Sequence, residues 1–191
     1  TITVSTSAAP ISVADAYTVN EGETLTVAVG QGVLANDVDI DPLTATLGTS
    51  TSNGVLTFSA DGSFSYVHDG SETTTDSFTY TASDGTDTGS VTTATITITP
   101  VNDAPVVSAA TLTTLEDTAG SVTLSGTDAD GDALTYSAGA ATNGTVTVSG
   151  STATYTPNAG YNGADSFTYT ANDGTVDSAP ATVTVTVTLV N

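Results

Sequence analysis

The feature that most constrains the fold is an internal repeat. The segment DSFTYTASDGT (76–86) returns as DSFTYTANDGT (165–175), 89 residues later and with one difference. NGVLTFS (53–59) and NGTVTVS (143–149) are offset by 90 residues. Self-similarity at such a period indicates two copies of one module.

The expected boundary between the copies lies in TPVNDAP, a linker centred on residues 99–105, where two prolines flank a turn-forming Asn-Asp pair. We therefore expect one domain over residues 1–101 and a second over 102–191. Residues 1–9 resemble the segment that leads into this linker, which predicts that they are the end of a preceding repeat.

Strict alternation of apolar residues and threonine predicts strands with one face in a core. In each copy the last such strand shows it most clearly, with these apolar residues on one face: Ala94, Ile96 and Ile98, then Val183, Val185, Val187 and Leu189. About seven short strands per copy, separated by Gly, Asp and Asn turns, are typical of a β-sandwich. The fold class predicted is all-β, with two tandem Greek-key β-sandwiches. Tyr80 and Tyr169 are expected in the cores.

The charge excludes several functions. The chain has no Lys or Arg, 21 acidic residues and a formal net charge of −21. Nucleic-acid binding, which needs cations against phosphates, is therefore not expected, and neither is membrane insertion, since no run of about 20 apolar residues occurs. With no cysteine and one histidine the chain cannot build a zinc site, and we expect His68 in a loop. We find no catalytic motif and expect no enzyme activity.

Aspartates are clustered in both copies, at positions 37, 39 and 41 and again at 128, 130 and 132. Two carboxylates about 4 Å apart repel by about 4 kcal/mol at an effective dielectric of 20. With no basic side chains to offset this, a divalent cation is the plausible counter-charge. Crowded carboxylate and carbonyl oxygens suit Ca²⁺ better than Mg²⁺ or Zn²⁺.

DADGDALTYS, GYNGADSFTYTANDGT and PVNDAP together resemble the bacterial cadherin-like or immunoglobulin-like repeats of large secreted (RTX-type) surface adhesins. The resemblance covers nearly the whole chain twice. It implies calcium bound at the domain junction, which stiffens the array. Carried over residue by residue, it implies these metal ligands at one junction: Glu21, Asp76, Asn102, Asp103, Asp128, Asp130, Asp132 and Asp173.

Two further sites are expected to be weaker or incomplete. Alignment of Pro10 with Pro105 sets Ser7 and Ala8 where Asn102 and Asp103 stand, so a first-domain site at Asp37, Asp39 and Asp84 lacks linker ligands, unless Asp15 helps to complete it. At the other end of the chain, Glu116 and Asp165 are expected to lack a following domain.

Ordinary structural roles stay open beside these hypotheses. Alternating aspartates can be solvated turn formers. Asp76 and Asp165 can simply begin a strand, and Asp84 and Asp173 can be turn residues.

The function expected is a calcium-rigidified spacer of a bacterial surface adhesin, extracellular, monomeric, and partnered by neighbouring repeats of the same chain. The alternative is a calcium-dependent carbohydrate- or peptide-binding module. Homotypic adhesion is a third possibility and rests on fold analogy alone.

Overall fold

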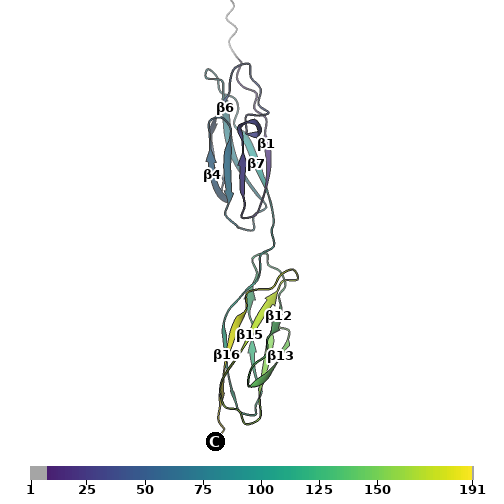
Figure 1. Cartoon of the computed structure of the whole chain (residues 1–191). Coiled ribbons are helices and arrows are strands. Elements are labelled where there is room, and N and C mark those ends of the chain that lie inside the picture. The colour runs from purple at the N-terminus through teal and green to yellow at the C-terminus, as the bar shows by residue number, and fades with distance from the viewer. Residues whose placement is uncertain (1–7, 191) are drawn as a thin grey trace, which may run out of the picture. The chain divides into compact units, whose positions relative to one another are not determined.

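The computed structural model describes residues 8–190 (Figure 1). Contacts divide the chain into two compact units between Val101 and Asn102, here called unit 1 and unit 2. The proposed remnant of a preceding repeat falls mostly on residues 1–7, outside the described part. So does Ser7 of the predicted linker comparison.

Over its described residues, 8–101, unit 1 has seven strands in two sheets, ordered β1-β7-β6-β3 and β2-β5-β4. The strands are β1 (Asp15–Asn20), β2 (Thr24–Val27), β3 (Thr44–Leu47), β4 (Gly54–Phe58), β5 (Phe64–His68), β6 (Thr75–Ser83) and β7 (Thr92–Thr99). One short 3-10 helix, η1 (Val29–Gln31), follows β2. Before β1, Ile11 forms an isolated antiparallel bridge with Val38.

Unit 2 repeats this arrangement, with sheets ordered β9-β16-β15-β12 and β10-β14-β13 and an added short pair, β8 with β11. Its strands are β8 (Val106–Val107), β9 (Ala110–Leu115), β10 (Gly120–Thr123), β11 (Gly126–Thr127), β12 (Thr135–Ala138), β13 (Gly144–Ser149), β14 (Thr152–Pro157), β15 (Gly163–Asn172) and β16 (Ala181–Thr188). The prediction of two all-β sandwiches is confirmed.

In each unit the long strand near the amino terminus pairs parallel with the last strand. In unit 1, β1 pairs with β7 from Asp15↔Ala94 to Asn20↔Thr99. In unit 2, β9 pairs with β16 from Ala110↔Val183 to Leu115↔Thr188. All other strand pairs are antiparallel.

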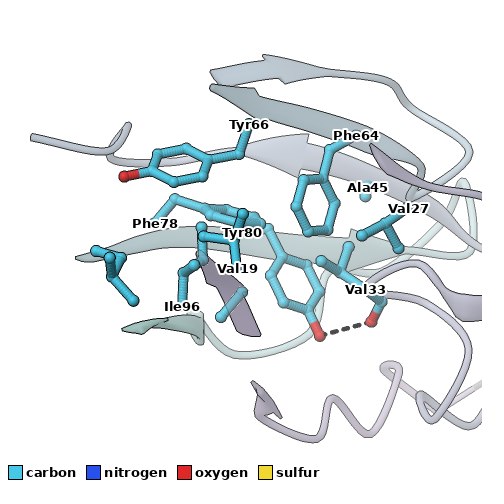
Figure 2. Close-up of a cluster of buried hydrophobic side chains, with 11 residues drawn as sticks. Val19, Val27, Val33, Ala45, Phe64, Tyr66, Phe78, Tyr80 and Ile96 are labelled. Carbon is cyan, nitrogen blue, oxygen red and sulfur yellow. Dashed lines mark hydrogen bonds between the residues drawn. The ribbon is translucent and has the colours of Figure 1, made fainter. Parts of the chain in front are cut away.

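The predicted alternation places side chains as expected. Ala94, Ile96 and Ile98 are buried in the core of unit 1, where Tyr80 and Phe78 also lie (Figure 2). Val183, Val185 and Val187 are equally buried in unit 2, and so is Tyr169. Leu189 departs from the pattern, because β16 ends at Thr188 and leaves its side chain 58% exposed.

Two further observations concern helices and His68. Among residues 8–190, no helix has the length and apolarity needed to cross a membrane.

The expectation of His68 in a loop is wrong, because it ends strand β5 and is only 3% exposed. The alternation of buried residues in β5 continues through His68, whereas the Asp-Gly pair that follows it in SYVHDG indicates a turn.

Candidate metal-binding sites

Three aspartates converge at the amino-terminal end of unit 1. The loop before β3 carries Asp39 and Asp41, and the turn after β6 carries Asp84. One carboxylate oxygen from each lies within 4.8 Å of the others. The sequence predicts Asp39 and Asp84 as ligands of one site, but the predicted set does not include Asp41. The alternation of three aspartates was the signal that could have included it.

Local hydrogen bonds set the conformation of this cluster. The backbone N–H of Asp41 donates to Oδ1 of Asp39 (2.9 Å). Oδ1 of Asp84 accepts the backbone N–H groups of Thr86 and Asp87, both at 2.7 Å. These hydrogen bonds give Asp39 and Asp84 a turn-forming role, and their assignment as metal ligands stays a prediction.

Asp37 and Asp15 lie behind this cluster, against Tyr80. The Tyr80 hydroxyl is 2.8 Å from the carbonyl oxygen of Val33 and 3.2 Å from both carboxylate oxygens of Asp37. Burial, together with the charge of Asp37, raises the pKa of Asp15 to about 6, although the hydrogen bond from Tyr80 opposes the rise. The protein thus holds two carboxylates beside one phenol.

Glu21 and Glu72 mark the opposite end of unit 1, where the chain leaves β7. Glu21 is 9% exposed, and its Oε2 accepts the backbone N–H of Val101 (3.2 Å). Its Oε1 is buried with no hydrogen-bond partner in the described structure. A carboxylate oxygen of Glu72 lies within 4.8 Å of one from Glu21. Glu72, in a loop without a repeated motif, gave no signal in the sequence.

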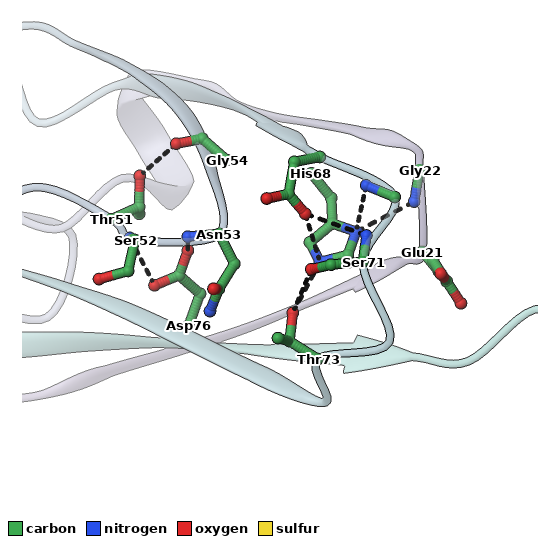
Figure 3. A network of polar contacts seen from close by, with 12 residues as sticks. Glu21, Gly22, Thr51, Ser52, Asn53, Gly54, His68, Ser71, Thr73 and Asp76 are labelled. Carbon is green, nitrogen blue, oxygen red and sulfur yellow. Dashed lines mark hydrogen bonds and ion pairs between the residues drawn. The ribbon is translucent and has the colours of Figure 1, made fainter. Parts of the chain in front are cut away.

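Asp76 has a clear role inside unit 1. Its carboxylate accepts the backbone N–H groups of Ser52 (3.0 Å) and Asn53 (2.8 Å) and the hydroxyl of Tyr66 (3.0 Å), as Figure 3 shows in part. Burial by itself raises the pKa of Asp76, but these donors and the N–H of Ser77 outweigh it and hold the pKa below its usual value.

Asp165 repeats this arrangement in unit 2. It accepts the backbone N–H of Asn143 (2.8 Å) and the hydroxyl of Tyr155 (2.9 Å). Burial by itself raises the pKa of Asp165. These two hydrogen bonds and the one from the N–H of Ser166 outweigh burial, so the pKa lies below its usual value. Asp76 and Asp165 therefore each join a loop to a tyrosine by hydrogen bonds. Their assignment as metal ligands stays a prediction.

At the amino-terminal end of unit 2 the predicted ligands come together through hydrogen bonds. The Asn102 side-chain amide donates to Oδ2 of Asp173 (2.9 Å). The backbone N–H of Asp103 donates to Oδ2 of Asp130 (2.8 Å). These contacts hold the linker segment against the aspartate loop and against the turn after β15.

Asp128 and Asp132 belong to the same loop. The backbone N–H of Asp132 donates to Oδ1 of Asp128 (3.2 Å), while Oδ2 of Asp128 is buried with no hydrogen-bond partner in the described part of the chain. Asp132 is exposed. Unlike their counterparts in unit 1, Asp130, Asp132 and Asp173 do not form a group of carboxylate oxygens within 4.8 Å, as far as residues 8–190 show.

Glu116, at the carboxyl-terminal end of unit 2, matches Glu21. Its Oε1 accepts the backbone N–H of Val190 (3.0 Å). The equivalent bond in unit 1 joins Glu21 to Val101. Each unit thus presents a glutamate where its last strand ends.

The donor set fits calcium. The candidate ligands are carboxylate and amide oxygens, the atoms that Ca²⁺ prefers. Buried carboxylate oxygens without hydrogen-bond donors, as in Glu21 and Asp128, are costly unless a cation compensates them. Lys and Arg are absent from the sequence, so no such side chain can supply that charge.

Family comparisons agree with the fold. A bacterial cadherin-like domain model matches residues 7–100, and a bacterial Ig domain model matches residues 102–186. Each unit thus matches one of these families, and the chain is a tandem of bacterial cadherin-like and Ig-like domains. Domains of these kinds are typically extracellular and are not catalytic kinds. No curated protein matches the chain.

Solved structures show the same architecture. The EC21-23 segment of human CDH23 is 16% identical with a TM-score of 0.61, over 95% of this chain and 70% of that one. Human mucin-like protocadherin EC1-2 is 14% identical with a TM-score of 0.54, over 95% and 98% of the two chains. An endo-fucoidan hydrolase of glycoside hydrolase family 107 is 23% identical with a TM-score of 0.40, and the chain spans 29% of its length. At these identities the likeness to the cadherins is one of fold.

Proposed function

We propose that the chain is a pair of calcium-stiffened spacer repeats from a bacterial surface adhesin, which projects a distal binding domain from the cell. The observation that carries this is the group of Asp39, Asp41 and Asp84 oxygens within 4.8 Å of one another, in a sequence without Lys or Arg. Such a group is electrostatically unfavourable alone and becomes favourable around a dication.

Calcium, when bound, supplies positive charge and joins segments that are distant in the sequence. In unit 1, Asp39 and Asp41 would hold it from the loop before β3 and Asp84 from the turn after β6. The resemblance implies a second set of ligands around the linker: Glu21, Asp76, Asn102, Asp103, Asp128, Asp130, Asp132 and Asp173.

The negative charge suits a long extracellular array. A net charge of −21 keeps neighbouring copies soluble and mutually repulsive. Extracellular calcium modules bind with dissociation constants of about 10⁻⁴–10⁻³ M. Such sites fill outside a cell and stay largely empty inside it, so folding is favoured after export.

Scanning calorimetry of the whole chain at rising calcium concentrations tests the proposal, because it measures how much calcium stabilises unit 1. The variant Asp41→Asn is compared with Glu23→Gln, which removes one charge in the same way. Glu23 is exposed and lies outside the aspartate cluster. At about a hundred times the dissociation constant, calcium should stabilise unit 1 by about 2.7 kcal/mol. Asp41→Asn should remove most of this gain, and Glu23→Gln should keep it.

Small-angle scattering with calcium and with a chelator tests the stiffening itself. We expect a longer maximum dimension and a narrower range of conformations with calcium. Identical scattering and melting under both conditions would exclude calcium-dependent stiffening. Antibody labelling of intact cells that produce the parent protein checks the surface location.

A further inference from the structure

His68 is the one basic-type side chain in the interior of unit 1, and its ring is fully engaged (Figure 3). Nδ1 lies 3.1 Å from the backbone nitrogen of Gly22 and 3.3 Å from that of Gly70, and both N–H groups donate to it. A ring nitrogen accepts hydrogen bonds only when it carries no proton. The proton is therefore on Nε2, which donates to Oγ1 of Thr73 at 3.0 Å.

The ring fastens the turn that carries Glu21. Gly22 follows Glu21 directly and has a φ of +66°, a conformation that suits glycine. The backbone N–H of His68 also donates to the carbonyl of Glu23 (3.1 Å). The side chain and the backbone of His68 thus hold the two residues that follow Glu21. The Oε1 atom of Glu21 is itself buried and has no hydrogen-bond partner in the described structure.

Unit 2 fastens the corresponding turn by different chemistry. There the residue after the glutamate is Asp117, with a φ of +58°, and its Oδ1 accepts the backbone N–H of Gly160 (2.8 Å). The strand position of His68 is taken by Pro157, because Gly54↔His68 and Gly144↔Pro157 are equivalent pairs. Two unrelated hydrogen bonds therefore do the same task, which indicates that the turn needs an anchor from the end of β5 or from the loop after β14.

We propose that His68, as a neutral imidazole protonated on Nε2, is a positioning residue that holds Glu21 in place for a cation. The inference rests on the proposed function and names a residue that controls one of its sites. One of the bonds to the ring fixes the backbone of Gly22, the residue directly after Glu21. Residues that orient a metal ligand change metal affinity by about 10- to 100-fold when they are removed.

The test uses the whole chain labelled with ¹³C on the glutamate carboxyl groups. The chain has four glutamates, so the signals of Glu21 and Glu116 can be followed separately during a titration with calcium chloride. His68→Leu removes the ring acceptor, and His68→Gln restores an oxygen that can accept from Gly22. We expect His68→Leu to weaken the calcium response of Glu21 by about tenfold. His68→Gln should recover most of it, and Glu116 should respond alike in all three proteins.

An equal calcium response of Glu21 in His68→Leu and the native protein would overturn the proposal. So would a Gln variant no better than the Leu variant. A metal-free measurement separates this from failure of the proposed function: the ¹⁵N–¹H spectrum of the native imidazole and the exchange rate of the Gly22 amide. We expect the proton on Nε2 and a protected Gly22 amide that exchanges faster in His68→Leu. A proton on Nδ1 would overturn the positioning role whether or not calcium binds.

Discussion

Tyr80 in unit 1 and Tyr169 in unit 2 occupy matching places in the two cores, but their hydroxyls meet different partners. The Tyr169 hydroxyl lies 2.6 and 3.0 Å from the carbonyl oxygens of Ser108 and Ser125. The Tyr80 hydroxyl also reaches two carbonyl oxygens, and in addition the carboxylate of Asp37. Desolvation and the nearby charges of Asp15 and Asp37 raise the pKa of Tyr80 well above its usual value.

The two units also differ at one strand position near these tyrosines. Asp15 begins β1 opposite Ala94, whereas Ala110 begins β9 opposite Val183, the residue that matches Ala94. Unit 1 therefore places one more carboxylate against its core at the end where Asp39, Asp41 and Asp84 converge. Two copies of one sandwich can therefore differ in charge at one end while their cores stay alike. Unit 1 should thus depend more on pH and on cations.

The largest effect should come from a feature that the units share. Asp76→Ala leaves three backbone N–H groups and the Tyr66 hydroxyl without their acceptor, and should destabilise unit 1 by about 3 kcal/mol. Asp165→Ala should act in the same way on unit 2. Amide hydrogen exchange of the whole chain, read separately in each unit, measures both. Equal destabilisation of both units by either variant would contradict the division into independent cores.

A smaller effect should distinguish the units. Asp15 has a raised pKa, so its carboxyl group is most favourable to folding below pH 3.8, and this contribution is lost as the pH rises to about 6. Asp15→Asn should therefore stabilise metal-free unit 1 at pH 7 and have little effect near pH 3.5. The measurement is the melting temperature in chelator across this pH range.

The reciprocal variant, Ala110→Asp, is the control for Asp15→Asn. It should destabilise unit 2 at pH 7, because it adds a partly buried carboxylate beside Tyr169. Asp76 gives the opposite pH dependence, since its pKa is lowered: its contribution is full above pH 3.8 and is lost at lower pH. An unchanged pH profile in Asp15→Asn would show that Asp15 is not the source of the difference.

The smallest effect should come from the turn after Glu116. Asp117→Gly loses the hydrogen bond to Gly160 but relieves a left-handed conformation, and each term is about 1 kcal/mol. The two should nearly cancel in the free energy of unfolding. Asp117→Ala loses the bond and relieves nothing, because alanine tolerates the left-handed conformation no better than aspartate, and should cost at least about 1 kcal/mol. Denaturant unfolding followed through Tyr155 and Tyr169 would compare them, and a larger loss in the Gly variant would contradict this balance.

The strands and cores could be predicted from the sequence because a period of two identifies which face is buried. Ala94, Ile96 and Val183 were placed correctly on that ground alone. The same pattern says nothing about which strand is the neighbour. The parallel pairing of β1 with β7 and the short pair of β8 with β11 were not predicted for this reason.

The sites were predictable only in part. Repetition in register pointed to the aspartate loops, and the structure brings Asp39 and Asp84 together as expected. The repetition in the sequence does not predict the contacts of Asp76 with Ser52 and Tyr66 or of His68 with Gly22, because the fold brings these partners together. Hydrogen-bond donors to a carboxylate leave no periodic signal in the sequence.

The parallel pairing of the terminal strands has a mechanical consequence. Within unit 1 the chain reaches β1 at one end of the sandwich and leaves β7 at the other, because both strands run in the same direction. Tension applied through the chain then pulls these two neighbours in opposite directions along their length. The register from Asp15↔Ala94 to Asn20↔Thr99 is loaded in shear, with its backbone hydrogen bonds sharing the force rather than opening one after another. β9 and β16 give unit 2 the same resistance to pulling.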